Sequence, residues 1–142
     1  MNTVRQLIDQ KPGEIVCIDP DCSVLDAVRE MADRDIGSVL VTRDDQLVGI
    51  LTERHYARNV ILAGRRSDST PVSEAMAAEP VCVSPDQTVE ECMALMTENR
   101  IRHLPVLDGE KLIGVVSIGD LVKNRIADQE EMIDQLTRYI QS

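Results

Sequence analysis

The sequence predicts an α/β (α+β) fold built from two copies of one strand–helix–strand–strand–helix unit. Val16–Ile61 aligns with Val81–Ile126 without a gap, and many of the paired positions carry identical residues. Short apolar runs and helical apolar stripes follow each other in the same order in both segments. One unit of about 50 residues is too small to bury both faces of its sheet. We therefore expect the two units to pack through their sheets about a pseudo-twofold axis.

Each unit is expected to begin with a short strand and to continue with a helix that a capping box opens. A hairpin with an acidic or glycine turn and a second helix complete the unit. The expected strands are Ile15–Ile18, Ser38–Thr42, Leu47–Leu51, Val81–Val83, His103–Leu107 and Lys111–Val116. The expected helices open at Ser23, Glu53, Thr88 and Ile118.

Between and after the units lie a connector and a C-terminal extension. A short helix is expected over Val72–Ala77 in the connector, with Thr70 as its N-cap. In the extension, Ile133, Leu136 and Ile140 are spaced i, i+3, i+7, so this stripe covers either the chain's own core or a partner subunit. We expect a homodimer. The expected boundaries are 10–66 for the first repeat, 67–76 for the connector, 77–132 for the second repeat and 133–142 for the helical extension.

The charge balance argues against several classes of partner. The chain carries 25 acidic and 15 basic residues, a net charge of -10, and it has no Trp or Phe and only 2 Tyr. Such a chain repels a phosphate backbone and offers bases few rings to stack on, so nucleic-acid binding is not expected. No apolar run is long enough to span a bilayer, so no membrane partner is expected. The segment MNTVRQLIDQ lacks the apolar core of a secretory signal, which predicts a cytoplasmic location.

The sequence lacks the motifs that are typical of common enzyme classes. It contains no GxGxxG, Walker A or GxSxG run, so no catalytic residues are assigned. None of the cysteines forms a C-x-x-C pair, and with two histidines neither a metal site nor a covalent cofactor is expected. Cysteines in apolar surroundings are most often small buried residues, and a thiol-based redox sensor is the alternative. The cysteines are Cys17, Cys22, Cys82 and Cys92.

Two segments carry a family resemblance. They are GILTERHYARNVI (Gly49–Ile61) and RIRHLPVLDGEKLIGVVSIGDLVKNRI (Arg100–Ile126), and the second contains a Gly-apolar-apolar-Ser-x-x-Asp pattern from Gly114 to Asp120. The chain resembles the tandem CBS-domain family, whose paired unit is called a Bateman module. The stretch DSTPVSEAM (Asp68–Met76) looks like the connector of its small stand-alone bacterial members.

The resemblance implies two βαββα repeats with two clefts near the pseudo-twofold axis. Family members often bind AMP, ADP or ATP there, and some bind S-adenosylmethionine or NAD(H). The bound ligand usually tunes an enzyme or channel. With no catalytic domain in this sequence, we expect a stand-alone sensor that binds an adenosine nucleotide and signals to an unidentified target protein. AMP is the leading candidate for this nucleotide, ahead of ATP, NADH and S-adenosylmethionine. A ligand-free interaction or dimerisation module is the alternative.

The resemblance also assigns roles to residues of the second repeat. Asp120 matches the family carboxylate that holds the ribose, and Ser117 is placed to bond the ribose or the base edge. Ser117-x-x-Asp120 is also a capping box, which would stabilise the helix without any ligand. Arg102 and His103 match basic residues that meet phosphates, with an exposed arginine and a strand-edge histidine as the alternative.

The base is expected to lie between aliphatic side chains, although each of these is equally expected in the core. By alignment with the family they are Val81, Ile101, Pro105 and Val116.

The first repeat departs from the family pattern, because His55 stands where the second repeat has Asp120. An imidazole does not replace a carboxylate as a diol acceptor, so this cleft is expected to be weaker, empty or altered in specificity. A basic cluster at this helix start is either a phosphate site or a solvated helix start. The basic residues are Arg54, His55 and Arg58, and Thr52 precedes them in the same candidate site.

Overall fold

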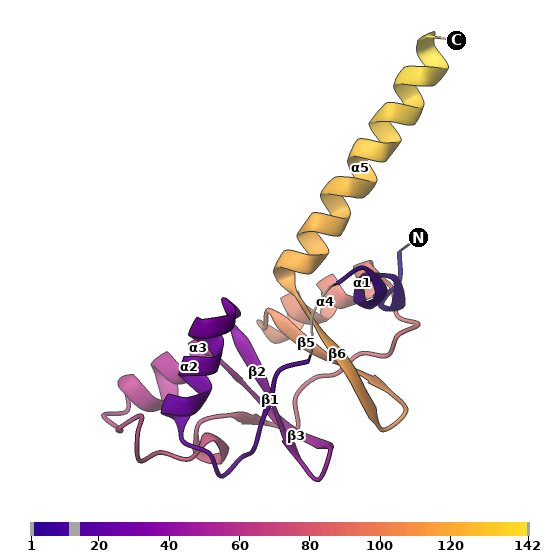
Figure 1. Ribbon diagram of the computed structural model, residues 1–142. Helices are drawn as coiled ribbons and strands as arrows, with labels where there is room; N and C mark the ends of the chain where they lie inside the picture. The colour runs from indigo at the N-terminus through magenta and orange to yellow at the C-terminus, as the bar shows by residue number, and fades with distance from the viewer. Residues whose placement is uncertain (1, 12–14, 142) are drawn as a thin grey trace.

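The computed structural model describes residues 2–11 and 15–141 and shows two halves side by side, with one long helix projecting from the second half (Figure 1). The first half contains β1 (Cys17–Ile18), α2 (Val24–Arg34), β2 (Ser38–Arg43), β3 (Gln46–Thr52), α3 (Glu53–Tyr56) and the π-helix η1 (Ala57–Ile61). The second contains α4 (Val89–Asn99), β5 (His103–Asp108), β6 (Lys111–Ser117) and α5 (Ile118–Gln141). The segments that lead into them are α1 (Val4–Gln10), the 3₁₀ helix η2 (Val72–Glu74) and β4 (Ala77–Ala78).

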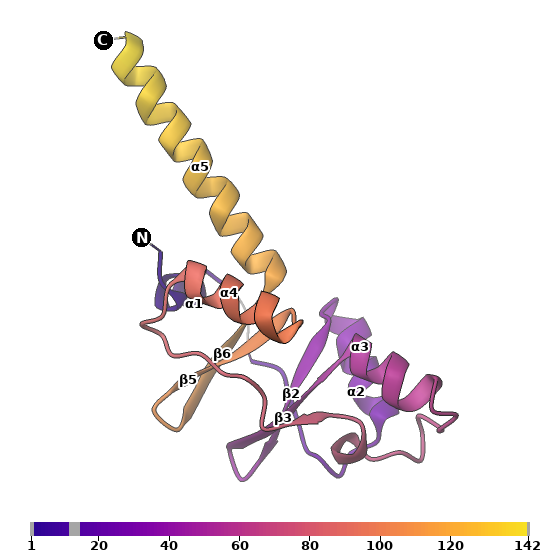
Figure 2. The same cartoon turned by 180° about the vertical axis from the view of Figure 1, so that it is seen from behind.

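The duplication predicted from the sequence is confirmed element by element. α2 and α4, β2 and β5, and β3 and β6 begin and end at aligned residues. Both hairpins are antiparallel, and each carries its register shift at the same place, at Val41/Thr42 and at Val106/Leu107. The two hairpins meet where β3 contacts β6 (Figure 2). This is the expected α/β architecture of two repeats packed through their sheets.

The first sheet is the larger of the two. Its order is β1-β2-β3-β4, with β1 parallel to β2 and the other neighbours antiparallel. The second sheet is the β5-β6 hairpin, and Val83 forms an isolated parallel bridge with Val106 in the place that β1 holds in the first half. The strand predicted at Val81–Val83 is therefore reduced to one bridge.

The segment that precedes each repeat, called its lead segment here, packs into the core of the other repeat. The lead segment of the first repeat is α1, and that of the second repeat is η2 with β4. Val4 and Leu7 of α1 are buried with Leu104 and other residues of the second half. Val72 and Ala75, which precede the second repeat, are buried in the core of the first half. Burial of a side chain of this size contributes about 1.5–3 kcal/mol, so each lead segment holds the opposite repeat in place.

Main-chain hydrogen bonds also hold each lead segment against the opposite repeat. The Val4 N–H donates to the Gln87 carbonyl at 2.9 Å, in front of α4. In front of α2, the Val24 N–H donates to the Thr70 carbonyl at 2.8 Å, and the Val72 N–H donates to the Cys22 carbonyl at 2.8 Å. The lead segments are therefore bonded to the helix starts as well as packed against them.

The connector differs from the sequence prediction. Its helix is a single 3₁₀ turn, η2, which does not continue to Ala77, because the next residues form β4 against Gly49 and Ile50. Thr70 is not its N-cap. Its hydroxyl donates to the Arg66 carbonyl at 2.6 Å and so closes the connector loop instead.

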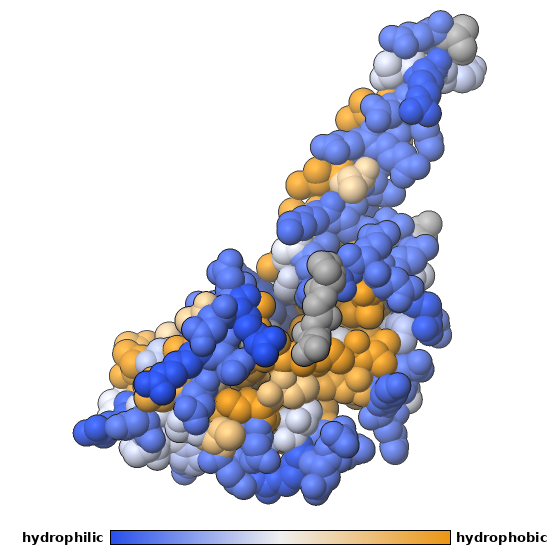
Figure 3. All heavy atoms as spheres, viewed as in Figure 1, coloured by the Kyte–Doolittle hydropathy of each residue, from blue (hydrophilic) through white to orange (hydrophobic). Residues whose placement is uncertain are grey.

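Helix α5 leaves the body of the protein after its first turns. Leu121 is buried, whereas every residue from Arg125 to Gln141 is exposed. The space-filling view shows apolar side chains recurring along this projecting segment (Figure 3). Within the described ranges, no helix combines the length and the apolar character that crossing a bilayer requires.

Different segments pack against two equivalent glycines, so substituting each glycine by alanine should lower the free energy of unfolding by different amounts. A Cβ at Gly49 would lie 2.8 Å from the Ala77 carbonyl oxygen of β4 and would also overlap Met76, whereas a Cβ at Gly114 would meet the terminal Cδ1 of Ile8 at 2.5 Å. Backbone moves less easily than a side-chain end. Gly49→Ala should therefore lower the free energy of unfolding by about 1–3 kcal/mol, and Gly114→Ala by less than about 1 kcal/mol. Urea unfolding of both variants measures this difference, and equal losses would contradict it.

Candidate functional site

A cavity of about 510 Å³ lies between the two repeats, within the usual range for a small-molecule site. The first repeat contributes the segment before β1, the end of α2 and the start of β2. The second repeat contributes β6 and the start of α5, and Lys11 reaches the cavity from the end of α1. The site is therefore shared by both repeats and by a lead segment.

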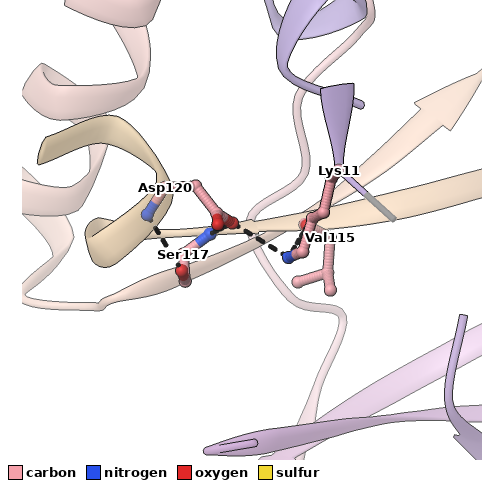
Figure 4. Close-up of polar contacts among 4 residues, drawn as sticks. All are labelled: Lys11, Val115, Ser117 and Asp120. Atoms are coloured by element: carbon pink, nitrogen blue, oxygen red, sulfur yellow. Dashed lines mark hydrogen bonds and ion pairs between the residues drawn. The ribbon is translucent and has the colours of Figure 1, made fainter. Parts of the chain in front are cut away.

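Asp120 stands at the start of α5 on the wall of this cavity (Figure 4). Its Oδ2 accepts hydrogen bonds from the Ser117 backbone N–H at 2.8 Å and from Lys11 Nζ at 2.9 Å. The Ser117 hydroxyl in turn accepts from the Asp120 N–H at 3.2 Å, which completes a capping box. Oδ1 of Asp120 accepts no hydrogen bond from any residue that the structure describes. One carboxylate oxygen thus serves the fold and the other remains for a ligand.

The Asp120 carboxyl is ionised at neutral pH. Burial raises its pKa, but the bond from the Ser117 backbone and the nearby Lys11 ammonium outweigh burial and hold the pKa below its usual value. Lys11 Nζ also donates to the Val115 carbonyl at 3.0 Å, which anchors the ammonium beside the carboxylate. An ionised carboxylate accepts stronger hydrogen bonds than a neutral group does.

His103 lines the same cavity from the start of β5. Burial and the neighbouring Lys11 lower the pKa of this imidazole, which is therefore neutral at pH 7 and can both donate and accept a hydrogen bond. Arg34 and Lys11 bring positive charge to the lining, and Asp35 and Asp120 bring negative charge. A polar ligand of mixed charge suits this lining.

Three comparisons with known proteins agree with this geometry. The family model named CBS domain matches residues 4–61 and again residues 72–127. The chain belongs to the CBS-domain family. It is 31% identical over 121 residues to the CBS domain-containing protein YhcV of Bacillus subtilis, covering 85% of this chain and 86% of that one.

Two further relatives extend this result. A mitochondrial CBS domain-containing protein of Arabidopsis thaliana, CBSX3, is 41% identical over 126 residues, which are 85% of this chain and 61% of that protein. This chain thus spans less than two thirds of the Arabidopsis protein. A solved CBS-domain protein from Burkholderia ambifaria superposes with a TM-score of 0.87 at 52% identity, covering 90% of this chain and 96% of that one. CBS-domain proteins are generally regulatory, and this chain contains two such repeats.

The CBS repeats build the cavity across their interface. Among the residues predicted from the sequence, Asp120, Ser117 and His103 line it together. The four predicted apolar residues lie elsewhere: Val116 is in the core of the second repeat, Val81 and Ile101 pack against that core, and Pro105 is buried.

The apolar wall beside Asp120 comes from the opposite CBS repeat. Val16 and Ile36 line the cavity, and in the repeat alignment they are the counterparts of Val81 and Ile101. The cavity beside Asp120 is therefore lined by the counterparts of Val81 and Ile101 from the first repeat.

Arg102 is exposed and does not line the cavity of Asp120. In the alignment it is the counterpart of Gly37, which does line that cavity. The two carbonyls play the same structural part, since Gly37 accepts from the Glu53 N–H at 3.1 Å and Arg102 accepts from the Ile118 N–H at 2.9 Å. Arg102 therefore occupies the equivalent place on the side of His55.

At the start of α3, His55 performs the capping role of Asp120. Its Nδ1 accepts from the Thr52 N–H at 3.1 Å, and the Thr52 hydroxyl accepts from the His55 N–H at 3.2 Å. Burial and the adjacent Arg54 and Arg58 lower the pKa of His55. Arg54 donates to the Arg100 carbonyl at 3.2 Å across the repeat boundary. Local structure is thus preserved without a carboxylate.

The cysteines are less uniform than the sequence predicted. Cys92 is buried as expected, but Cys17 is exposed, because β1 is an edge strand of its sheet. Partial desolvation of the thiols raises the pKa of Cys17 and Cys82, and desolvation raises that of Cys92 to about 11, so thiolate is scarce at neutral pH. In the described part of the chain, no three His, Cys, Asp or Glu side chains gather into a metal site.

We predict that Asp120→Asn lowers the free energy of unfolding by about 0.5–2 kcal/mol near pH 7, because it weakens the cap and the Lys11 ion pair. The folded-state pKa of Asp120 is depressed, so its contribution is complete above the unfolded value of 3.8 and is lost as the pH falls through the folded value. Thermal unfolding of both proteins near pH 7 and at about pH 3 tests this. A difference that stays constant with pH would contradict it.

A second prediction concerns His55, whose folded-state pKa lies below 6.5. The unfolded chain then binds the proton first, so wild-type stability should fall as the pH drops from about 7.5 to about 5.5. His55→Asp keeps an acceptor at this cap and removes the titration. The free energy difference between wild type and variant should therefore shift in favour of the variant on acidification. His55 is one of the groups that lower the pKa of His103, so removing it raises that pKa and shifts the difference in the same direction. A pH-independent difference would refute the prediction.

Proposed function

We propose that this chain is a regulatory protein that binds an adenosine nucleotide in the cavity beside Asp120, with AMP as the first candidate, and signals to a target protein. The observation that carries the proposal is an ionised carboxylate with one uncommitted oxygen, facing a cavity that both repeats line. CBS domains generally bind adenosine ligands, which agrees with this chemistry.

In this proposal, Asp120 Oδ1 accepts hydrogen bonds from the ribose cis-diol. Each charge-assisted bond of this kind contributes about 1.5–3 kcal/mol. Ser117 lies one turn before, where its hydroxyl can reach the ribose or the base edge. The adenine lies against aliphatic side chains, with Val16 and Ile36 in the roles that the sequence assigned to Val81 and Ile101.

Lys11 and Arg34 supply the positive charge that a phosphate needs in an acidic chain. His103 adds a neutral donor beside them. Arg102, at the place equivalent to Gly37, serves the other cleft together with Thr52, Arg54, His55 and Arg58. That cleft lacks the carboxylate, so it binds an adenosine ligand more weakly or only through its phosphates.

The proposed ligand contacts both repeats and binds Asp120 Oδ1, while Ser117 and Lys11 keep their bonds to Oδ2. Lys11 follows α1, which is packed in the core of the second repeat. A ligand that interacts differently with two packings of the module shifts the population between them, and the target protein recognises one of the two.

Isothermal titration calorimetry with AMP, ATP, NADH and S-adenosylmethionine tests this function. Heat is the direct observable because the chain has no Trp. We expect one site per chain for at least one of these ligands. Asp120→Ala should weaken binding by about 10- to 100-fold, because the variant loses the diol acceptor.

Asp128→Ala is the matched control, since Asp128 is exposed on the same helix and outside the cavity lining. It should bind like the wild type. If none of the four ligands binds the folded protein, the nucleotide proposal is wrong and the complete capping box of Asp120 is purely structural. That result would favour a ligand-free interaction module.

A further inference from the structure

We propose that α5 joins this chain to a second copy of itself as a parallel, two-stranded coiled coil. Residues 126–141 of the helix are exposed and project from the body, and no other helix or strand lies alongside them in either view (Figures 1 and 2). In proteins, most helical stability comes from packing of an apolar face rather than from intrinsic propensity. The exposed part of α5 therefore gains stability when its apolar side chains pack against a partner.

The apolar residues of α5 recur with the seven-residue (heptad) period of coiled coils, whose positions are lettered a to g and whose contacts lie at a and d. Isoleucine occupies each a position, and the d positions carry Val, Gln and Leu. Ile133 and Leu136 remain 61% and 57% exposed in the single chain. β-Branched residues at a with Leu at d favour two-stranded coiled coils. The a positions are Ile126, Ile133 and Ile140, and the d positions are Val122, Gln129 and Leu136.

The a and d positions together form a seam along α5, and this seam faces away from the chain's own body. Leu121 and Asn124, which fall at positions c and f, make the contacts with the body: Leu121 is buried, and the Asn2 side chain donates to Asn124 Oδ1 at 2.9 Å. Positions a and d lie on the opposite side of the helix from these contacts. A second helix can therefore pack along the seam without displacing the repeats.

Charge complementarity selects a second copy in parallel orientation. Arg125 is at position g and Glu130 is at position e of the next heptad, the spacing at which g and e side chains of parallel partners meet. Two such pairs form in a symmetric dimer. In the antiparallel arrangement that aligns a with d, Glu130 would instead face its own copy. Arg125 Nη1 bonds Glu90 at 2.7 Å within one chain, so dimerisation redirects an exposed side chain that is already on this edge.

Gln129 supports the same register. A single polar residue in an otherwise apolar seam is costly unless it bonds its own counterpart, which it meets only in a parallel, in-register dimer. In the antiparallel alternative, Gln129 would lie opposite Ile133 and bury an unpaired amide. The seam therefore specifies both the partner and its direction.

Sedimentation or light scattering over about 1 to 100 µM tests the interface. Ile133→Asp should weaken self-association by at least about 100-fold. Gln135→Asp is the matched control, with the same new residue and the same charge change on the outer face, and it should associate like the wild type. Circular dichroism checks that both variants remain folded. A monomeric wild type, a trimer or larger assembly, or a dimer that survives Ile133→Asp would overturn the proposal.

A disulfide test determines the orientation. Under mild oxidation, Gln129→Cys chains should link into covalent dimers, whereas Glu131→Cys chains, with the thiol at position f, should behave like the wild type. The native cysteines are common to all three proteins and set the background. If linkage instead requires mixing Gln129→Cys with Ile133→Cys chains, or if Glu131→Cys links equally well, the parallel arrangement is wrong. This test is independent of nucleotide binding.

Discussion

The exchange of lead segments is the constraint on which the rest of the structure depends. α1 completes the core of the second repeat, and η2 with β4 completes the first. Neither half can therefore bury its apolar residues with its own segment alone, and the two must fold against each other. The same crossing carries the chain past the repeat interface. It places Lys11 beside Asp120 and leaves a cavity whose walls come from both halves.

The two repeats share the same backbone structure at the helix after the hairpin but differ in the charge of the side chain that caps this helix. The helix that follows each hairpin starts with a capping box, made by Ser117 and Asp120 in one repeat and by Thr52 and His55 in the other. Either side chain satisfies the orphan N–H groups of a helix start, so stability alone does not choose between them. The charge differs, however. Only the carboxylate attracts an ammonium group, which Lys11 supplies beside Asp120.

Local patterns predicted the repeated elements well, because helix periodicity, capping residues and turn residues act over a few positions. The family resemblance, rather than local pattern, assigned Asp120, Ser117 and His103 to one site, and the structure places all three on the wall of one cavity. Local patterns do not show where distant segments meet. Val16 and Ile36 of the first repeat line that cavity, and a wall contributed by the other repeat leaves no trace in local spacing. The predicted connector helix was wrong for this reason, because pairing with β3 overrides a short helix.

The candidate cavity and the exposed seam share one helix. Asp120 lies in the first turn of α5, and the heptad begins at Val122 on the next positions. A helix of 24 residues spans about 36 Å as one hydrogen-bonded rod, so a change in the direction of its first turn displaces its far end much further. Two such helices joined in parallel would hold both modules at one end of a common rod. A ligand that alters the contacts of Asp120 then changes the angle between the modules, and linkage requires the dimer to alter ligand affinity by the same factor.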